Sequence, residues 1–88
     1  MNAYECRLTA AGMELIRTLT GFSIEDAYIG SVFGANETLA RQDAATSVAV
    51  LVREALTDQR FPDLRLRSAL MDPMYISCLL AGNRADNV

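Results

Sequence analysis

The sequence lacks the side chains that most enzymes use to move protons. It contains no histidine, and its eight basic residues are all arginine, so lysine is also absent. Histidine and lysine are common general bases, and histidine is the usual group that activates a serine or cysteine nucleophile. We therefore expect no base that could activate Ser31. We expect a protein that is not an enzyme and uses no cofactor, since an enzyme would need a metal or a site shared between copies.

The acidic residues and the cysteines suggest no catalytic or metal site. Glu25 and Asp26 are adjacent, but neighbouring side chains on a helix point about 100° apart and do not converge on a substrate. Acids in the first turn of a helix are favoured by its dipole, which explains this pair without a function. Cys6 and Cys78 are too few for a zinc site in a chain without histidine. The sequence does not show whether these two cysteines are near each other.

No run of apolar residues reaches the length of about 18 that a membrane-spanning helix needs. The first residues also lack the basic and apolar regions of a signal peptide. We therefore expect a cytoplasmic protein without membrane contact, in which Cys6 and Cys78 are reduced thiols.

The charge of the chain disfavours nucleic acid as a partner. The net charge is −3, from eleven acidic and eight basic residues. Such a chain repels a phosphate backbone unless a local arginine patch overcomes the repulsion. Arg60, Arg65 and Arg67 form the one cluster of basic residues in the sequence. Phosphate or a partner's carboxylates would bind such a cluster, and a solvated rim explains it as well.

The segment from Gly34 to Gln42 is the part of the sequence that most suggests DNA binding. A turn glycine before a helix with a polar first turn is typical of a helix-turn-helix motif. Capping of the helix by Asn36 and an i,i+4 ion pair between Glu37 and Arg41 explain the same residues without DNA. A helix-turn-helix transcriptional regulator is therefore the alternative function, and its predicted DNA contacts are Asn36, Thr38, Arg41 and Gln42.

Large apolar residues crowd the C-terminal third of the chain. Methionine and tyrosine are favoured at adaptable binding surfaces, and a protein interface commonly has an apolar centre with charges at its rim. Packing in a core would use the same residues. The predicted docking face comprises Arg60, Phe61, Arg65, Arg67, Met71, Met74 and Tyr75.

These observations favour a small non-enzymatic protein that acts by binding a protein partner. Apolar residues make up 51% of only 88 residues, and a domain of this size cannot bury every large side chain. A homodimer is the simplest way to cover the remainder. We expect an accessory regulator or inhibitor that forms a homodimer. The size and the use of arginine in place of lysine suggest a bacterial, phage or plasmid source.

Capping residues and hydrophobic spacing divide the chain into helical segments. Thr9 and Gly21 bracket a helix over 9–20. A variant capping box at Ser23 predicts a second helix that ends at Gly34, and Asn36 begins a long central helix. Within that helix, the β-branched stretch 48–52 would also suit a buried strand, but the length of the pattern favours a helix.

The segments after the predicted break at Phe61–Pro62 suit either helix or strand. If these segments are helical, residues 62–71 and 72–80 form two more helices. If they are strands, residues 72–80 complete a hairpin. The favoured fold is mainly α, a compact domain of four to five helices over residues 1–88 with a frayed tail at 83–88. The alternative is an α+β domain with two or three short strands at 3–8, 63–69 and 74–80.

Overall fold

The first strand of the protein follows from alternating apolar side chains. In the computed structural model, which describes residues 1–56 and 63–83, β1 (Asn2–Leu8) is a strand of 7 residues. Tyr4, Cys6 and Leu8 are buried on one side of it, because successive side chains of a strand point to opposite faces of the sheet. The residues between them therefore belong to the face that points away from the core.

Helix α1 (Ala10–Thr20) lies between the two capping residues that the sequence predicts, Thr9 and Gly21. The Thr9 hydroxyl accepts a hydrogen bond of 3.0 Å from the backbone amide of Gly12, which is an N-cap arrangement. Gly21 has a φ of 78° and donates its amide to the carbonyl of Arg17 at 2.8 Å. Glycine adopts this left-handed backbone without strain, so it ends the helix. The prediction of this helix is confirmed.

Strand β2 (Tyr28–Gly34) lies where the sequence predicts a helix that begins at Ser23, and this prediction is wrong. The capping box gives way to a turn, in which the Asp26 carboxylate accepts the backbone amide of Tyr28 at 3.0 Å. The segment then pairs with β1 in antiparallel register. Its aromatic and β-branched residues favour a strand and its two glycines disfavour a helix, so pairing with β1 decides its structure.

The long helix α2 (Glu37–Ala55) is confirmed together with its N-cap. The Asn36 side-chain oxygen accepts the amide of Leu39 at 2.9 Å. The ambiguous stretch 48–52 is helical, and it buries only one side of the helix, since Val50 is 49% exposed. Most of the buried side of α2 is alanine and valine. These small side chains let the helix lie close to the sheet, and α2 contacts all three strands.

Helix α3 (Asp63–Leu70) resolves one of the two ambiguous C-terminal segments. Leu66 and Leu70 are fully buried and are four residues apart, so they lie on the same side of the helix. The strand alternative over 63–69 is therefore wrong. The predicted break at Phe61–Pro62 lies outside the described residues.

Strand β3 (Ile76–Asn83) replaces the helix that the sequence favours over 72–80, and this prediction is also wrong. Asp72 stabilises a turn before the strand. Its side chain accepts the amide of Met74 at 2.9 Å, and its carbonyl accepts the amide of Tyr75 at 2.9 Å. The chain then pairs with β1 in antiparallel register. Of the predicted frayed tail at 83–88, Asn83 is the last residue of β3 and the others lie outside the described residues.

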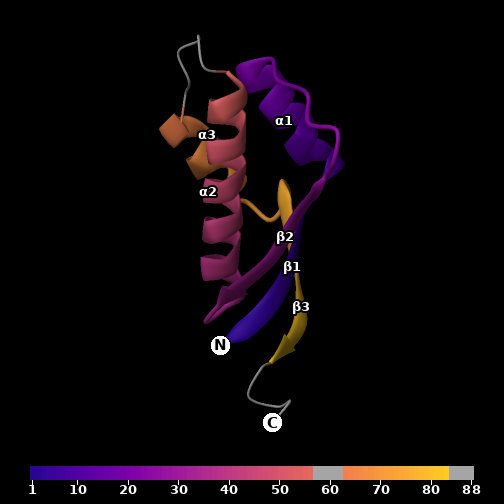
Figure 1. Ribbon diagram of the computed structural model, residues 1–88, viewed down its shortest axis with the longest axis vertical. Helices are drawn as coiled ribbons and strands as arrows, with labels where there is room; N and C mark the ends of the chain where they lie inside the picture. The colour runs from indigo at the N-terminus through magenta and orange to yellow at the C-terminus, as the bar shows by residue number, and fades with distance from the viewer. Residues whose placement is uncertain (57–62, 84–88) are drawn as a thin grey trace.

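The three strands form one antiparallel sheet in the order β2-β1-β3. Helix α2 runs along one face of this sheet, and α1 and α3 lie at the end opposite the start of β1 (Figure 1). The described residues thus form an α+β domain with three helices and three strands, so the expectation of a mainly α fold with four to five helices is wrong. The α+β alternative has the correct class and includes strands near β1 and β3, but it does not include β2.

The helices of the described part of the chain are not membrane-spanning segments, because none is both long and apolar enough to cross a bilayer.

Replacing Gly12 by alanine tests the close packing of α1 against the turn before β3. A Cβ atom at position 12 would lie 2.2 Å from the carbonyl oxygen of Tyr75, which is a severe overlap. Alanine normally stabilises a helix by about 1 kcal/mol relative to glycine. Here we expect Gly12→Ala to lower the free energy of unfolding by roughly 1–3 kcal/mol, as overpacked substitutions do. Urea unfolding measures this change.

The control is Ala11→Gly, at the exposed neighbouring position of the same helix. Helix propensity alone predicts a loss of about 1 kcal/mol for this variant. A Gly12→Ala protein that is more stable than the wild type would contradict the described packing.

Candidate interaction surface

The structure places the predicted docking residues at different parts of the fold. Arg67 and Met71 line a shallow groove of about 360 Å³ between α2 and α3, together with Leu64, which is 73% exposed. Met74 is exposed in the turn before β3, and Tyr75 is half-buried against the core. Arg65 is exposed on α3, and Arg60 and Phe61 lie outside the described residues.

The helix-turn-helix alternative requires a first helix and four exposed residues, and the structure provides neither. The element before Asn36 is β2, so the first helix of that motif is a strand here. Thr38 and Gln42 are exposed on α2, and Asn36 is occupied as the N-cap. Arg41 is only 5% exposed. These residues therefore do not form the exposed recognition helix that the motif requires.

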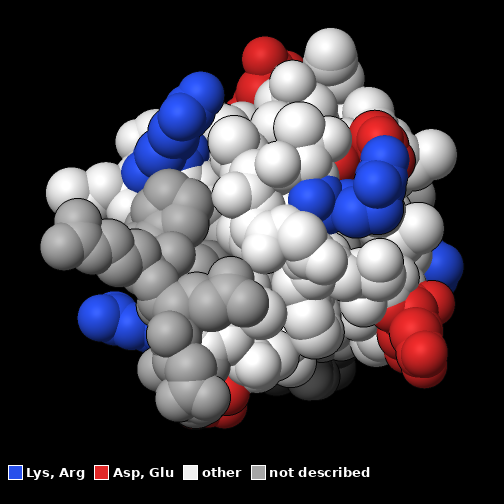
Figure 2. All heavy atoms as spheres, turned by 90° about the horizontal axis from the view of Figure 1, so that it is seen from above, with Lys and Arg blue, Asp and Glu red and all other residues white. Residues whose placement is uncertain are grey.

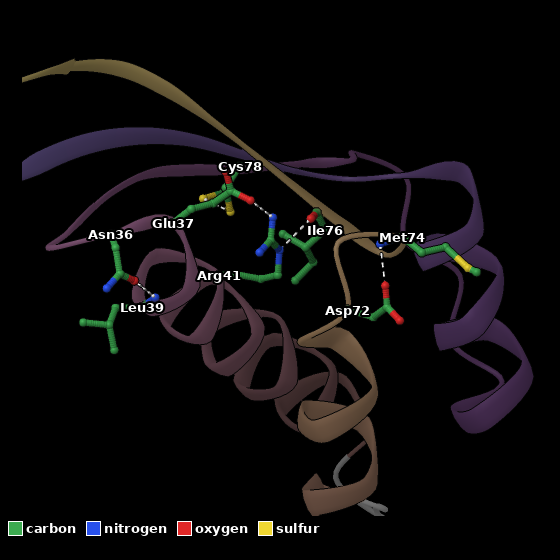
Figure 3. A network of polar contacts seen from close by, with 9 residues as sticks. Asn36, Glu37, Leu39, Arg41, Asp72, Met74, Ile76 and Cys78 are labelled. Atoms are coloured by element: carbon green, nitrogen blue, oxygen red, sulfur yellow. Dashed lines mark hydrogen bonds and ion pairs between the residues drawn. The ribbon is translucent and has the colours of Figure 1, made fainter.

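Arg41 instead links α2 to β3 within the core, as Figure 3 shows. Its Nε donates a hydrogen bond of 3.0 Å to the carbonyl of Ile76. Its terminal nitrogen donates to the Glu37 carboxylate at 2.7 Å, which confirms the predicted i,i+4 ion pair. A buried guanidinium is stable only when it is paired and hydrogen-bonded in this way. We therefore assign Arg41 a structural role.

The two cysteines, whose relation the sequence left open, face each other across neighbouring strands. Cys6 of β1 is directly opposite Cys78 of β3, and their sulfur atoms are 3.0 Å apart. Both side chains are buried. Burial, followed by the contact with Cys78, raises the pKa of the Cys6 thiol to about 12. The thiol is therefore protonated at neutral pH and is a poor nucleophile.

The face of the sheet away from α2 is a surface that the sequence analysis does not predict. No described helix covers it, and it displays apolar side chains to solvent: Phe33 of β2 is 45% exposed and Leu79 of β3 is 69% exposed. The strand registers place Phe33 opposite Ala3, and Leu79 opposite Glu5. We call this surface the open sheet face, and its residues are Ala3, Glu5, Arg7, Tyr28, Ser31, Phe33, Ser77 and Leu79.

A fixed carboxylate lies in the middle of the open sheet face. Ser31 donates a hydrogen bond to one oxygen of Glu5, and the Tyr28 hydroxyl donates to the other at 2.7 Å. The hydrogen bond from Ser31 is the largest cause that lowers the pKa of Glu5, and that from Tyr28 is the second. The guanidinium of Arg7 lies 5.6 Å from the centre of the Tyr28 ring, a cation–π distance. Opposite charges thus lie side by side on the central strand.

The alternation of polar residues in 3–8 is the one sequence signal that points to this face. It predicts that Glu5 and Arg7 lie on the same side of a strand. The partners from β2 could not be found, because that segment was predicted to be helical.

The described side chains at the end of the molecule seen in Figure 2 form no strongly basic patch, and the described residues provide no metal site. Figure 2 shows arginine and acidic side chains interspersed among neutral atoms over one end of the molecule. Within the described residues, no group of three or more histidine, cysteine, aspartate or glutamate side chains is placed to hold a metal ion. The features that the geometry does provide are the open sheet face and the groove between α2 and α3.

The hydrogen bonds to Glu5 give a first test of this surface. Removing both donors in a Tyr28→Phe/Ser31→Ala variant should raise the pKa of Glu5 toward its ordinary value of 4.5, because these bonds favour the ionised carboxylate. In the wild type, ionised Glu5 favours the folded state above pH 4.5, and this contribution is lost as the pH falls through the lowered pKa. Carbon-detected NMR titration measures the pKa directly.

Glu14 is the internal control for this titration. Arg17 lowers the pKa of Glu14, and neither substitution touches that pair. The pKa of Glu14 should therefore stay unchanged. A Glu5 pKa that is the same in variant and wild type would show that the hydrogen bonds are absent in solution.

Truncation of Arg41 tests its structural role. We expect Arg41→Met to lower the free energy of unfolding by about 1–3 kcal/mol, because the buried carbonyl of Ile76 loses its side-chain donor. The matched control is Arg53→Met, on an exposed side of the same helix, for which a change within about 0.5 kcal/mol is expected. Equal stabilities of the two variants would contradict the role assigned to Arg41.

Comparison with protein-family models, with curated proteins and with solved structures finds no match for this chain. Function is therefore argued from the geometry of the chain itself.

Proposed function

We propose that this chain is a non-enzymatic binding protein whose contact surface is the open sheet face, and that the occupant of this face is a second copy of the chain. The observation that carries the proposal is an uncovered sheet face with exposed Phe33 and Leu79 on its outer strands. Antiparallel sheets often bury one face and leave the other solvated, but the solvated face is then normally polar. Exposed aromatic and aliphatic side chains on such a face favour a protein contact.

The chemistry of the described residues supports binding over catalysis. The chain has no histidine or lysine. The Cys6 thiol has a raised pKa and is buried, and the pKa of Glu5 is lowered, so its carboxylate remains ionised and is a weak base at neutral pH. None of these groups is tuned toward pH 7, as a general acid or base needs to be.

The arrangement of charges favours a second copy as the occupant. Glu5 and Arg7 lie on the open sheet face of the central strand, one on either side of the inward-facing Cys6. Two copies can stack face to face about a two-fold axis that lies in the plane between the two faces and is perpendicular to the strands. In this arrangement the two β1 strands lie over each other and run in opposite directions. Glu5 then lies over the partner's Arg7, and Arg7 lies over the partner's Glu5. This self-complementary pattern is what an isologous dimer interface requires.

The other symmetric arrangement is electrostatically unfavourable. A two-fold axis parallel to the strands would stack Glu5 on the partner's Glu5, and like charges at an interface cost several kcal/mol. The axis across the strands is therefore the one that we propose. It also lets the sheets pack nearly aligned, as the two sheets of a β-sandwich do.

The size of the face limits the strength of this dimer. Strands of 7 residues at a rise of about 3.3 Å, in three rows about 4.8 Å apart, give a face of roughly 23 by 14 Å. Stable interfaces usually bury about 800 Å² on each partner. We therefore expect a weak dimer. A weak dimer suits a regulator or inhibitor, because one copy can dissociate and another protein can bind in its place.

Charged substitutions on the open sheet face provide the first test. Phe33→Asp and Leu79→Asp should each weaken self-association by at least about tenfold, because each buries a carboxylate at the interface. Sedimentation velocity from micromolar to millimolar protein measures the association. The matched control is Leu64→Asp, since Leu64 is 73% exposed, close to the 69% of Leu79, but lies in the groove between α2 and α3.

Each outcome of this comparison is informative. A wild type that stays monomeric at millimolar concentration would contradict the proposal. Loss of association in Leu64→Asp or Met74→Asp, with Phe33→Asp unaffected, would move the interface to the docking face that the sequence predicts.

Charge reversal tests the direction of the two-fold axis. Glu5→Arg and Arg7→Glu should each weaken the dimer, because each places like charges over one another. The double variant Glu5→Arg/Arg7→Glu restores opposite charges at both positions and should recover most of the association. If the double variant is as weak as the sum of the two single ones, these residues do not pair across the interface.

A further inference from the structure

We propose that Cys6 and Cys78 form a dithiol site that small-molecule disulfides oxidise to an intramolecular disulfide between β1 and β3. The two residues are direct partners in the register of these strands. Their sulfur atoms are 3.0 Å apart within the core, whereas bonded sulfurs are about 2.05 Å apart. A movement of about 1 Å brings the two sulfurs to bonding distance, and the product keeps the observed strand pairing.

The position of the two strands in the sheet determines which cysteine reacts first. β3 is an edge strand, whereas β1 is paired on both sides. Cys78 is 5% exposed and Cys6 is 0% exposed. Local separation of β3 from the sheet exposes Cys78 without unfolding the rest of the core. Cys78 is thus the residue that attacks the reagent, and Cys6 is the residue that resolves the intermediate.

The reaction is a two-step thiol–disulfide exchange. In the first step, the Cys78 thiol loses its proton, its sulfur attacks one sulfur of the reagent, and the other half of the reagent leaves as a thiolate. In the second step, Cys6 loses its proton and attacks the Cys78 sulfur, and the second half of the reagent leaves. The protein dithiol is oxidised by two electrons, and one reagent disulfide is reduced to two thiols that take up the two protons.

The surroundings of Cys6 make the second step slow at neutral pH. Burial raises the pKa of the Cys6 thiol, whereas Arg41 on α2 and Glu5 on β1 act on it in opposite directions. The contribution of the Cys78 thiol to this pKa is lost once Cys78 carries half of the reagent. Burial therefore slows the loss of the Cys6 proton that the second step requires.

The product crosslinks residues that are 72 positions apart. Closing so long a loop restricts the unfolded chain strongly. For a domain of this size we expect the melting temperature of the oxidised protein to rise by roughly 10 °C or more. Adding a reducing agent should reverse the shift.

The experiment uses the full chain and oxidised glutathione as the reagent. Intact mass spectrometry of the wild type should show first one bound glutathione and then a species that has lost two hydrogen atoms. Peptide mapping without reduction should identify the link between Cys6 and Cys78. Cys6→Ser should stop at one bound glutathione, and Cys78→Ser should react much more slowly because its remaining thiol lies in the central strand.

The wild-type measurements alone decide the proposal if a serine variant fails to fold. A wild type that stays fully reduced, that carries two separate glutathione groups, or that crosslinks only to other copies would overturn it. Failure here leaves the proposed self-association unaffected, because the open sheet face lies on the opposite side of the sheet from these sulfurs.

Discussion

The fold depends on the pairing of β1 with two strands that come from distant parts of the sequence. β2 and β3 each lie antiparallel to β1, and β3 starts about 70 residues after β1 begins. These pairings place Tyr4, Cys6 and Leu8 under α2 and build the core. They also create a second face that points away from the core, with Glu5 and Arg7 at its centre. The core and the candidate interface are therefore two sides of one central strand.

Three helix caps are predicted correctly from the sequence, whereas the two segments that pair with a distant strand are not. Thr9, Gly21 and Asn36 act as caps in the structure as predicted, because a cap is made by neighbouring residues. The segments that became β2 and β3 have turn residues that also suit helix starts, and Asp26 and Asp72 hold turns instead. Whether such a residue begins a helix or a turn before a strand depends on whether β1 is available to pair with the segment. The hydrophobic periodicity of one sequence does not show which strands pair.

The predicted docking residues and the open sheet face lie at different places in the fold. The abundance of apolar residues indicates that a surface remains to be covered, and the structure adds the open sheet face to the predicted docking residues. The expected ion pair of Arg41 is present, yet the same arginine is buried by β3. Its burial could not be anticipated while 72–80 was predicted to be a helix. The approach of Cys6 to Cys78 depends on the same strand pairing.

The proposed dimer brings two copies together at the uncovered side of the sheet. A concentration series of two-dimensional amide NMR spectra tests it most directly, because it locates the contact residue by residue without any substitution. Amide signals of β1, β2 and β3 should shift as the protein is concentrated, with the largest shifts near Phe33, Leu79 and Glu5. Shifts confined to α3 and the turn at Met74, or no shifts up to millimolar protein, would contradict it.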